Sequence, residues 1–211
     1  MDLLKEYDCL TYSSVSSPLD PTIKLRSEDG ALFPDPGYYR KLVGKLNFLT
    51  NTRLDIAYSV QHLIQFMQTP REPHLKAAIH VLRYLKKDPT LGIFLSNDPN
   101  YIVSAYCDSD WAACPDSTKS VSGYIVLLGE SPISWKSKKQ TIVSLPSTEA
   151  EYRSVRKVVG ELVMFSLKND SGAIGGKTRK ILSQNEQNRK NGHLGATGSA
   201  WRHLWRWRQN H

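Results

Sequence analysis

The spacing of apolar residues changes twice along the chain, and these changes limit what it can fold into. From Tyr38 to about residue 88, apolar residues recur every three or four positions, which predicts amphipathic helices. From residue 92 the spacing becomes two, which is typical of β-strands. Helical spacing returns over residues 147–165. We therefore expect a helical region, then an antiparallel sheet, then one further helix.

The helical region divides into three helices. The first carries Leu42, Leu46 and Leu49 and ends at Asn51–Thr52. The second carries an apolar stripe made of Ile56, Val60, Leu63, Ile64 and Met67. The third begins near Pro73, a residue suited to a first turn, and ends at Lys86–Lys87, whose charges suit a C-terminal end. Residues 1–37 contain several prolines and glycines and little periodicity, so we expect an extended linker there.

Five short runs of alternating residues predict an antiparallel meander. They are residues 92–96, 101–107, 120–128, 133–136 and 141–144, with a turn at 97–100. The helix that follows begins at Ser147 or Thr148, both of which are suitable caps. Its apolar face carries Val155, Val158, Val159 and Leu162. A sheet followed by a helix of this length predicts a domain that mixes α and β structure.

The net charge of +8 on 211 residues is typical of proteins that bind nucleic acid. Most of this charge lies at one end, because residues 166–211 hold nine Lys or Arg against Asp170 and Glu186, which leaves +1 for residues 1–165. This region has almost no aliphatic periodicity, so we expect a basic tail with little order. Its WRHLWRWR segment at 201–208 is an alternative site for base stacking or for a membrane interface.

Cysteine usage and hydropathy favour an intracellular protein, without indicating its compartment. The three cysteines are an odd number without CxxC spacing, so neither a disulfide framework nor a zinc site is indicated. The chain has no run of eighteen apolar residues, and its first residues do not resemble a signal peptide. We therefore expect a soluble, intracellular protein with reduced thiols and no membrane association.

Two acidic positions are candidates for chemistry. Asp108 and Asp110 follow a predicted strand and share its Tyr106 face, although a turn or cap role is the alternative. On the following helix, rotation by about 100° per residue brings Glu151 to the side of Val155 and places Glu149 with Arg153. A carboxylate facing the core is costly unless it is paired, protonated or bound to metal. The alternative is a capping box of Thr148 and Glu151.

The same residues resemble a known family. The segment at 39–95, the CDSDWA run at 107–112 and the STEAEY run at 147–152 resemble the Pol polyprotein of copia-type retrotransposons. Residues 16–25 also resemble that family's upstream linker. The resemblance covers roughly residues 10–163 and places the end of a reverse transcriptase before a ribonuclease H domain. No paired-aspartate YxDD turn is found, so we do not expect DNA synthesis.

The resemblance implies a ribonuclease H-like fold, a mixed α+β or α/β sheet with flanking helices that is incomplete at its C-terminus. It implies cleavage of the RNA strand of RNA–DNA hybrids with Mg²⁺ or Mn²⁺ at four carboxylates. Asp108 and Glu151 match two of these as catalytic metal ligands, whereas Asp110 and Glu149 match accompanying positions. Asp170 is the only candidate for the third carboxylate, and the tail offers no fourth. We therefore expect this copy to be inactive.

The resemblance also implies a domain plan and partners. It gives a linker at 1–37, a helical remnant of the reverse transcriptase thumb or connection at 38–95, a partial ribonuclease H-like domain at 96–165, and a tail at 166–211 outside the family register. The expected partners are an RNA–DNA hybrid or another nucleic acid and the remaining reverse transcriptase domains. Two alternatives stay open: a non-catalytic remnant that binds nucleic acid through Lys136, Lys138, Lys139 and the tail, and a pseudogene product without function.

Overall fold

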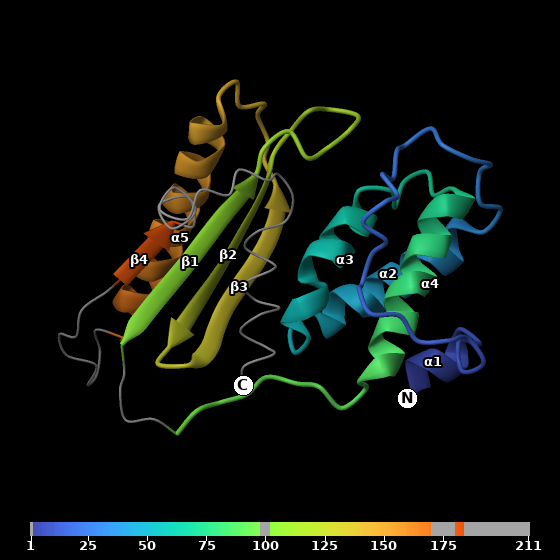
Figure 1. Ribbon diagram of the computed structural model, residues 1–211, viewed down its shortest axis with the longest axis horizontal. Coiled ribbons are helices and arrows are strands. Elements are labelled where there is room, and N and C mark those ends of the chain that lie inside the picture. The colour runs from blue at the N-terminus through green and yellow to red at the C-terminus, as the bar shows by residue number, and fades with distance from the viewer. Residues whose placement is uncertain (1, 98–101, 170–179, 184–211) are drawn as a thin grey trace. The chain divides into compact units, whose positions relative to one another are not determined.

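The computed structural model describes residues 2–97, 102–169 and 180–183 of the chain, with side chains up to residue 165. These residues belong to two compact units, Met1–Gly92 and Ile93–His211, called here the N-terminal and C-terminal units (Figure 1). Asp170, most of the tail and most of the turn at 97–100 lie outside the described residues. Among the described residues, no helix combines the length and the apolar character needed to cross a membrane.

The N-terminal unit is helical. Its elements are α1 (Asp2–Glu6), α2 (Pro36–Leu49), η1 (Leu54–Ile56), α3 (Ala57–Ile64) and α4 (Glu72–Lys87). The three predicted helices are confirmed. Asp35 caps α2 by accepting a hydrogen bond from the Tyr38 backbone N–H at 3.0 Å, as expected for a short acidic residue at this position. Proline stands in the first turn of both α2 and α4.

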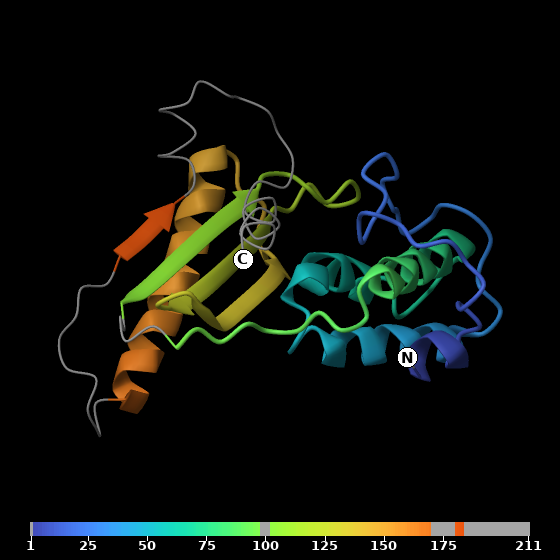
Figure 2. The same cartoon turned by 60° about the horizontal axis from the view of Figure 1, so that its bottom comes forward.

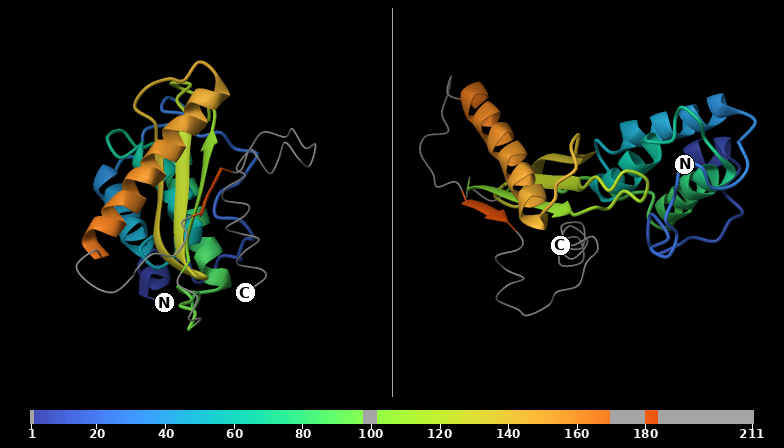
Figure 3. Two further views of the ribbon diagram at one scale, coloured as in Figure 1. Left: turned by 90° about the vertical axis from the view of Figure 1, so that its left-hand side faces the viewer. Right: turned by 90° about the horizontal axis from the view of Figure 1, so that it is seen from above.

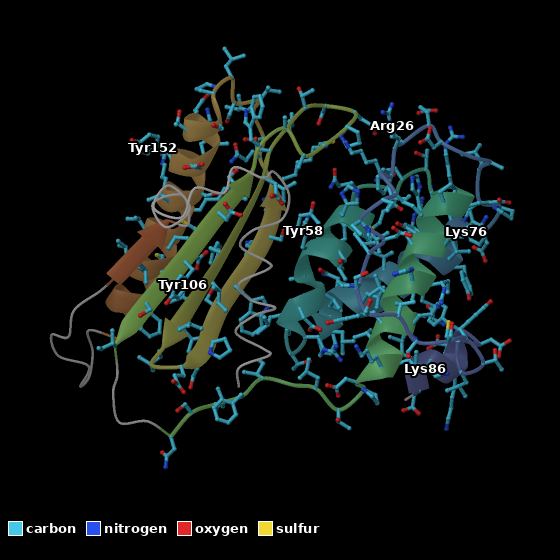
Figure 4. The ribbon with its side chains drawn as sticks, viewed as in Figure 1. Arg26, Tyr58, Lys76, Lys86, Tyr106 and Tyr152 are labelled. Atoms are coloured by element: carbon cyan, nitrogen blue, oxygen red, sulfur yellow. The ribbon has the colours of Figure 1, made fainter. Side chains whose placement is uncertain are left out.

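The core of this unit contains the predicted apolar stripes and also residues from the expected linker. Leu42, Leu46 and Leu82 are fully buried. Leu4, Tyr7 and Cys9 belong to the same core. Residues 1–37 therefore do not form a separate extended linker, because their apolar side chains pack on the helices although they lack a helical period. Lys86 also donates hydrogen bonds to the backbone carbonyls of Leu10 and Tyr12 (Figure 4).

The C-terminal unit is a sheet covered by a helix. Strands β1 (Val103–Asp110), β2 (Val121–Leu128) and β3 (Ser131–Lys139) form an antiparallel meander, and α5 (Ser147–Asn169) follows. A fourth strand, β4 (Lys180–Ser183), pairs parallel to β1, which gives the order β3-β2-β1-β4. The strands predicted around 101–107, 120–128 and 133–136 are thus confirmed. Strand β4 lies within the predicted low-order tail and was not expected.

Two of the predicted strands, 92–96 and 141–144, are wrong. Neither segment belongs to the sheet. Phe94 and Leu95 are exposed in the first, and Ile142 and Val143 in the second. Alternating apolar residues form a strand only where a neighbouring strand offers free backbone groups, and these segments have no such neighbour among the described residues.

Helix α5 packs on one face of the sheet (Figure 2). The core between them is formed by Val103, Ala105, Cys107, Tyr124, Val126, Val158 and Leu162. Because side chains alternate along a strand, the odd-numbered residues of β1 face α5. Tyr106, Asp108 and Asp110 therefore lie on the other face, as predicted. Tyr106 is 41% exposed there, and Figure 3 shows α5 on one side of the sheet.

Candidate metal and nucleic-acid site

Asp108 lies near the C-terminal end of β1. Its partner in the ladder is Gly123 of β2, which has no side chain to cover the carboxylate. Asp108 is half-buried. Asp110 ends the same strand opposite Val121. Both aspartates therefore belong to the last residues of β1 and not to the loop that follows it. The alternative, that they are turn residues, is not supported.

The buried side chain of Gln140 links the start of α5 to this end of the sheet through hydrogen bonds. The Gln140 amide nitrogen donates hydrogen bonds to the Ser122 hydroxyl at 2.8 Å, to the Ala150 carbonyl at 2.9 Å and to the Ser109 hydroxyl at 3.2 Å. Its oxygen accepts a hydrogen bond from the Ser144 hydroxyl at 3.1 Å. Gln140 is only 4% exposed. This network therefore joins β1, β2 and the first turn of α5.

A second hydrogen bond lies one turn further along the helix. The Ser154 hydroxyl donates to the backbone carbonyl of Asp108 at 2.8 Å. Glu151 lies between Ala150 and Ser154, the two positions at which α5 is attached to the sheet. These attachments bring Glu151 to the level of Asp108, at the C-terminal end of β1.

The orientation of the glutamates agrees with the predicted helical rotation. Glu151 is half-buried beside a fully or nearly buried stripe made of Ala150, Ser154, Val158 and Leu162. Glu149 lies on the other side and pairs with Arg153, with 2.7 Å between its carboxylate and the guanidinium. Because α5 begins at Ser147, Thr148 lies inside the helix, and the capping-box alternative is not supported.

The pKa of the Cys107 thiol is affected by the charges of both carboxylates. Burial is the main cause that raises the pKa of the Cys107 thiol to about 11, and the negative charges of Asp108 and Glu151 add to it. A carboxylate opposes ionisation of a thiol only at short range or through a poorly screening interior. The two carboxylates therefore act on the same buried residue although they come from different elements.

The donor chemistry suits a hard divalent cation. Carboxylate oxygens are the ligands preferred by Mg²⁺, which keeps several waters and is commonly held by one or two carboxylates together with substrate phosphates. Asp108 and Glu151 are two such carboxylates at the same end of β1, with the Asp108 side chain on the face of the sheet away from α5. Among the described residues, no group of three or more His, Cys, Asp or Glu side chains is placed to hold a metal. Asp170, the expected third ligand, lies outside the described residues.

The three predicted nucleic-acid lysines do not share one surface. Lys136 and Lys138 pair with Tyr124 and Ser122, whose side chains face α5, and both lysines are exposed. Lys139 pairs with Val121 on the opposite face, where its ammonium donates to the Cys114 sulfur at 2.8 Å. Lys136 and Lys138 therefore share one surface, and Lys139 lies on the other face of the sheet.

We expect Cys114 to be the most reactive of the three free thiols, because its sulfur contacts the Lys139 ammonium. Burial raises the pKa of the Cys114 thiol, but hydrogen bonds from Lys139 and Ser117 outweigh it and lower the pKa overall, whereas burial raises the pKa of Cys9 and Cys107. Since the thiolate is the nucleophile, we expect iodoacetamide at pH 8 to label Cys114 first, as read by peptide mass spectrometry. Lys139→Gln should slow this labelling, and faster labelling of Cys107 would contradict the assignment.

Relatives of the chain identify its origin. A retrovirus-related Pol polyprotein from transposon RE1 of Arabidopsis thaliana is 46% identical over 162 residues, which cover 77% of this chain and 11% of that polyprotein. The polyprotein of transposon TNT 1-94 from Nicotiana tabacum is 33% identical over 173 residues, or 76% of this chain and 13% of its own. An uncharacterized mitochondrial protein of A. thaliana, AtMg00810, is 38% identical over 165 residues, which cover 78% of this chain and 68% of that protein.

The chain belongs to the copia-type, retrovirus-related Pol proteins of transposons. It spans about a tenth of the length of the transposon polyproteins it matches. No family model matches the chain, and no solved structure matches it. Membership in the Pol family agrees with the resemblance carried by the helical segment, the CDSDWA run and the STEAEY run.

Sequence reasoning on this Pol fragment missed the residues that position the site. Gln140 and Ser154 hold α5 against β1, but neither stands in a charged or periodic pattern that would single it out. Arg153 and Lys157 on α5 were also missed as neighbours of the lysines on β3. Their spacing of four places them on one side of a helix, so the signal for this pair was present in the sequence.

Proposed function

We propose that the C-terminal unit is a ribonuclease H-like domain that binds RNA–DNA hybrids, and that in this copy Asp108 and Glu151 hold a divalent cation without cutting the RNA strand. The observation that carries the proposal is the attachment of α5 to the end of β1 through Gln140 and Ser154. This attachment brings two carboxylates from separate elements to one end of the sheet.

The order of elements supports a ribonuclease H-like fold for this unit. Three antiparallel strands are followed by a helix across one face and by a strand that returns parallel to β1. A parallel return after a helix is the crossover expected in mixed α/β sheets. Kinship with transposon Pol proteins supports a substrate that contains nucleic acid.

The number of ligands supports binding without cleavage. Bound Mg²⁺ or Mn²⁺ supplies Lewis-acid activation of water for phosphodiester hydrolysis, a reaction for which related nucleases use two ions about 4 Å apart. Two carboxylates are sufficient to hold one Mg²⁺ that keeps most of its waters. Asp108 and Glu151 alone carry too little negative charge to hold a pair of ions.

Manganese binding and hybrid cleavage test the proposal together. We expect the purified full chain to bind Mn²⁺ weakly, as measured by electron paramagnetic resonance of the free ion, and Asp108→Asn or Glu151→Gln to abolish this binding. A labelled RNA–DNA hybrid should bind to the chain and stay intact with Mg²⁺ or Mn²⁺. Asp110→Asn is the matched control and should leave Mn²⁺ binding unchanged.

Two outcomes would contradict this proposal in different ways. Cleavage that disappears in Asp108→Asn would mean that further ligands come from residues 170–211 or from another chain, so the copy would be active. Equal Mn²⁺ binding by wild type, Asp108→Asn and Glu151→Gln would mean that these carboxylates are not the metal ligands.

A further inference from the structure

Two lysines on β3 point to the same face of the sheet as α5. Lys136 pairs with Tyr124, whose side chain packs in the core beneath α5, and Lys138 pairs with Ser122, which accepts a hydrogen bond from Gln140. Residues directly opposite on paired strands share a face. Two residues of strand rise separate the Cα atoms of Lys136 and Lys138 by about 7 Å. Both side chains are exposed.

Two cations on α5 lie beside this row. Arg153 and Lys157 are one turn apart, so they occupy one side of the helix about 6 Å apart along its axis. Burial lowers the pKa of Lys157, and the charges of Lys138, Lys136 and Arg153 lower it further. Lys157 therefore lies near enough to Lys136, Lys138 and Arg153 for their charges to repel it. We call Lys136, Lys138, Arg153 and Lys157 the cationic patch.

One of the four cations of the patch, Arg153, is neutralised by an acidic residue. The pair is Glu149–Arg153. Burial raises the pKa of the Tyr124 hydroxyl to about 12, and the Glu161 carboxylate beside it is a further cause. Within the described part of the chain, Lys136, Lys138 and Lys157 form no ion pair. A cluster of like charges is unfavourable by itself, and an anion bound across it would relieve the repulsion.

The surface between the two rows shows which kind of anion fits. The cross-strand partners of Lys136 and Lys138, which are Tyr124 and Ser122, are buried, so on this face of β3 the lysines are exposed and their apolar neighbour is not. Surfaces that bind membranes combine cations with apolar residues that enter the lipid. Rows of Lys and Arg with regular spacing match the repeated phosphates of a nucleic acid, which need no base-specific contacts.

We propose that the cationic patch between β3 and α5 binds the sugar–phosphate backbone of a double-stranded nucleic acid. Contact with the duplex at this surface needs no divalent cation and does not involve Asp108 or Glu151. The choice of an RNA–DNA hybrid as the probe rests on the proposed function. The patch thus gives this copy a means of holding a duplex whether or not it cuts one.

The salt dependence of hybrid binding tests the patch. Affinity of the full chain for a fluorescein-labelled RNA–DNA hybrid would be measured by fluorescence anisotropy in EDTA at several salt concentrations. Each phosphate contact contributes about −0.9 to the slope of log affinity against log salt on a B-form duplex. We expect Lys136→Gln/Lys138→Gln to weaken binding and to reduce the magnitude of the slope by about 2.

A control with the same change in charge separates the patch from general basicity. Lys24→Gln/Lys76→Gln removes two exposed lysines of the N-terminal unit and should leave the slope unchanged. Figure 4 labels Lys76. The basic residues at 166–211 are present in every variant, so they contribute equally to all slopes. Lys157→Gln provides a second test from the helix side and should reduce the magnitude of the slope by about 1.

The possible failures of the patch and of the proposed function are distinguishable. If the chain binds the hybrid and the two double variants have the same salt slope, the proposed role of the patch is wrong. The proposed function would then still stand. A chain that does not bind the hybrid at all would overturn both. Loss of binding to phosphatidylserine vesicles in Lys136→Gln/Lys138→Gln, with hybrid binding unchanged, would show that the patch binds anionic lipid and would also overturn the proposal.

Discussion

Gln140→Leu is expected to destabilise the C-terminal unit by about 3 kcal/mol, because about 1 kcal/mol is lost for each net hydrogen bond and buried partners are left unsatisfied. The glutamine side chain is bonded to Ser109, Ser122, Ser144 and the Ala150 carbonyl. Leucine has a similar volume, so the loss would come from the polar network and not from a cavity.

Urea unfolding followed by tryptophan fluorescence measures this change. Trp111 reports on the region directly, since its indole nitrogen donates to the Ser144 carbonyl at 3.0 Å. The same substitution at the exposed Gln68 is the control and should change stability by less than about 0.5 kcal/mol. Equal stability of Gln140→Leu and the wild type would show that the network does not hold α5 in place.

Gln140→Glu distinguishes a need for hydrogen-bond donors from a need for side-chain volume. A carboxylate has no proton to donate at neutral pH, so it cannot satisfy the Ala150 carbonyl, and burial of its charge adds a further cost. The variant should therefore be at least as unstable as Gln140→Leu. Since Ala150 precedes Glu151, both variants should also weaken Mn²⁺ binding, even though neither removes a proposed ligand.

The helical stripes and strand alternation predicted most of the elements. The stripe of Leu42, Leu46 and Leu49 lies on α2, and the alternation around Tyr106 lies on β1. Residues 1–37 were misassigned because Leu4, Tyr7 and Cys9 are buried through tertiary contacts, which leave no local period. The segments at 92–96 and 141–144 have the period of a strand but no partner strand, and pairing is not encoded locally.

The candidate site was predictable where it depends on local geometry. Strand alternation placed Asp108 with Tyr106, and helical rotation placed Glu151 beside the buried stripe of α5. The role of Gln140 was not predictable, because it follows from contacts with three separate elements. Side chains alternate between the two faces of a strand. Once β3 is known to continue through residue 139, this alternation places Lys139 on the face opposite Lys136 and Lys138.

A buried ion pair in the N-terminal unit was also missed, and its loss should be as costly as that of the glutamine network. Arg53 donates two hydrogen bonds to the Asp55 carboxylate, at 2.9 and 3.0 Å, and one to the Asp88 carbonyl at 2.8 Å. Tyr84 donates to the same carboxylate at 2.8 Å. The side chains of Arg53 and Asp55 are only 4% and 11% exposed, so the pair joins η1 to the end of α4 away from solvent.

Arg53→Met is expected to destabilise the N-terminal unit by about 3–5 kcal/mol, since removing one partner leaves an uncompensated buried charge. Native-state hydrogen exchange of the α3 and α4 amides would measure the change. Arg153→Met, which breaks the more exposed pair with Glu149, is the matched control and should cost less than about 1 kcal/mol. Arg53→Met/Asp55→Leu should recover most of the loss, because it removes both charges together. If the double variant is as unstable as Arg53→Met, packing of the arginine stem and its bond to Asp88 stabilise the unit, and the ion pair does not.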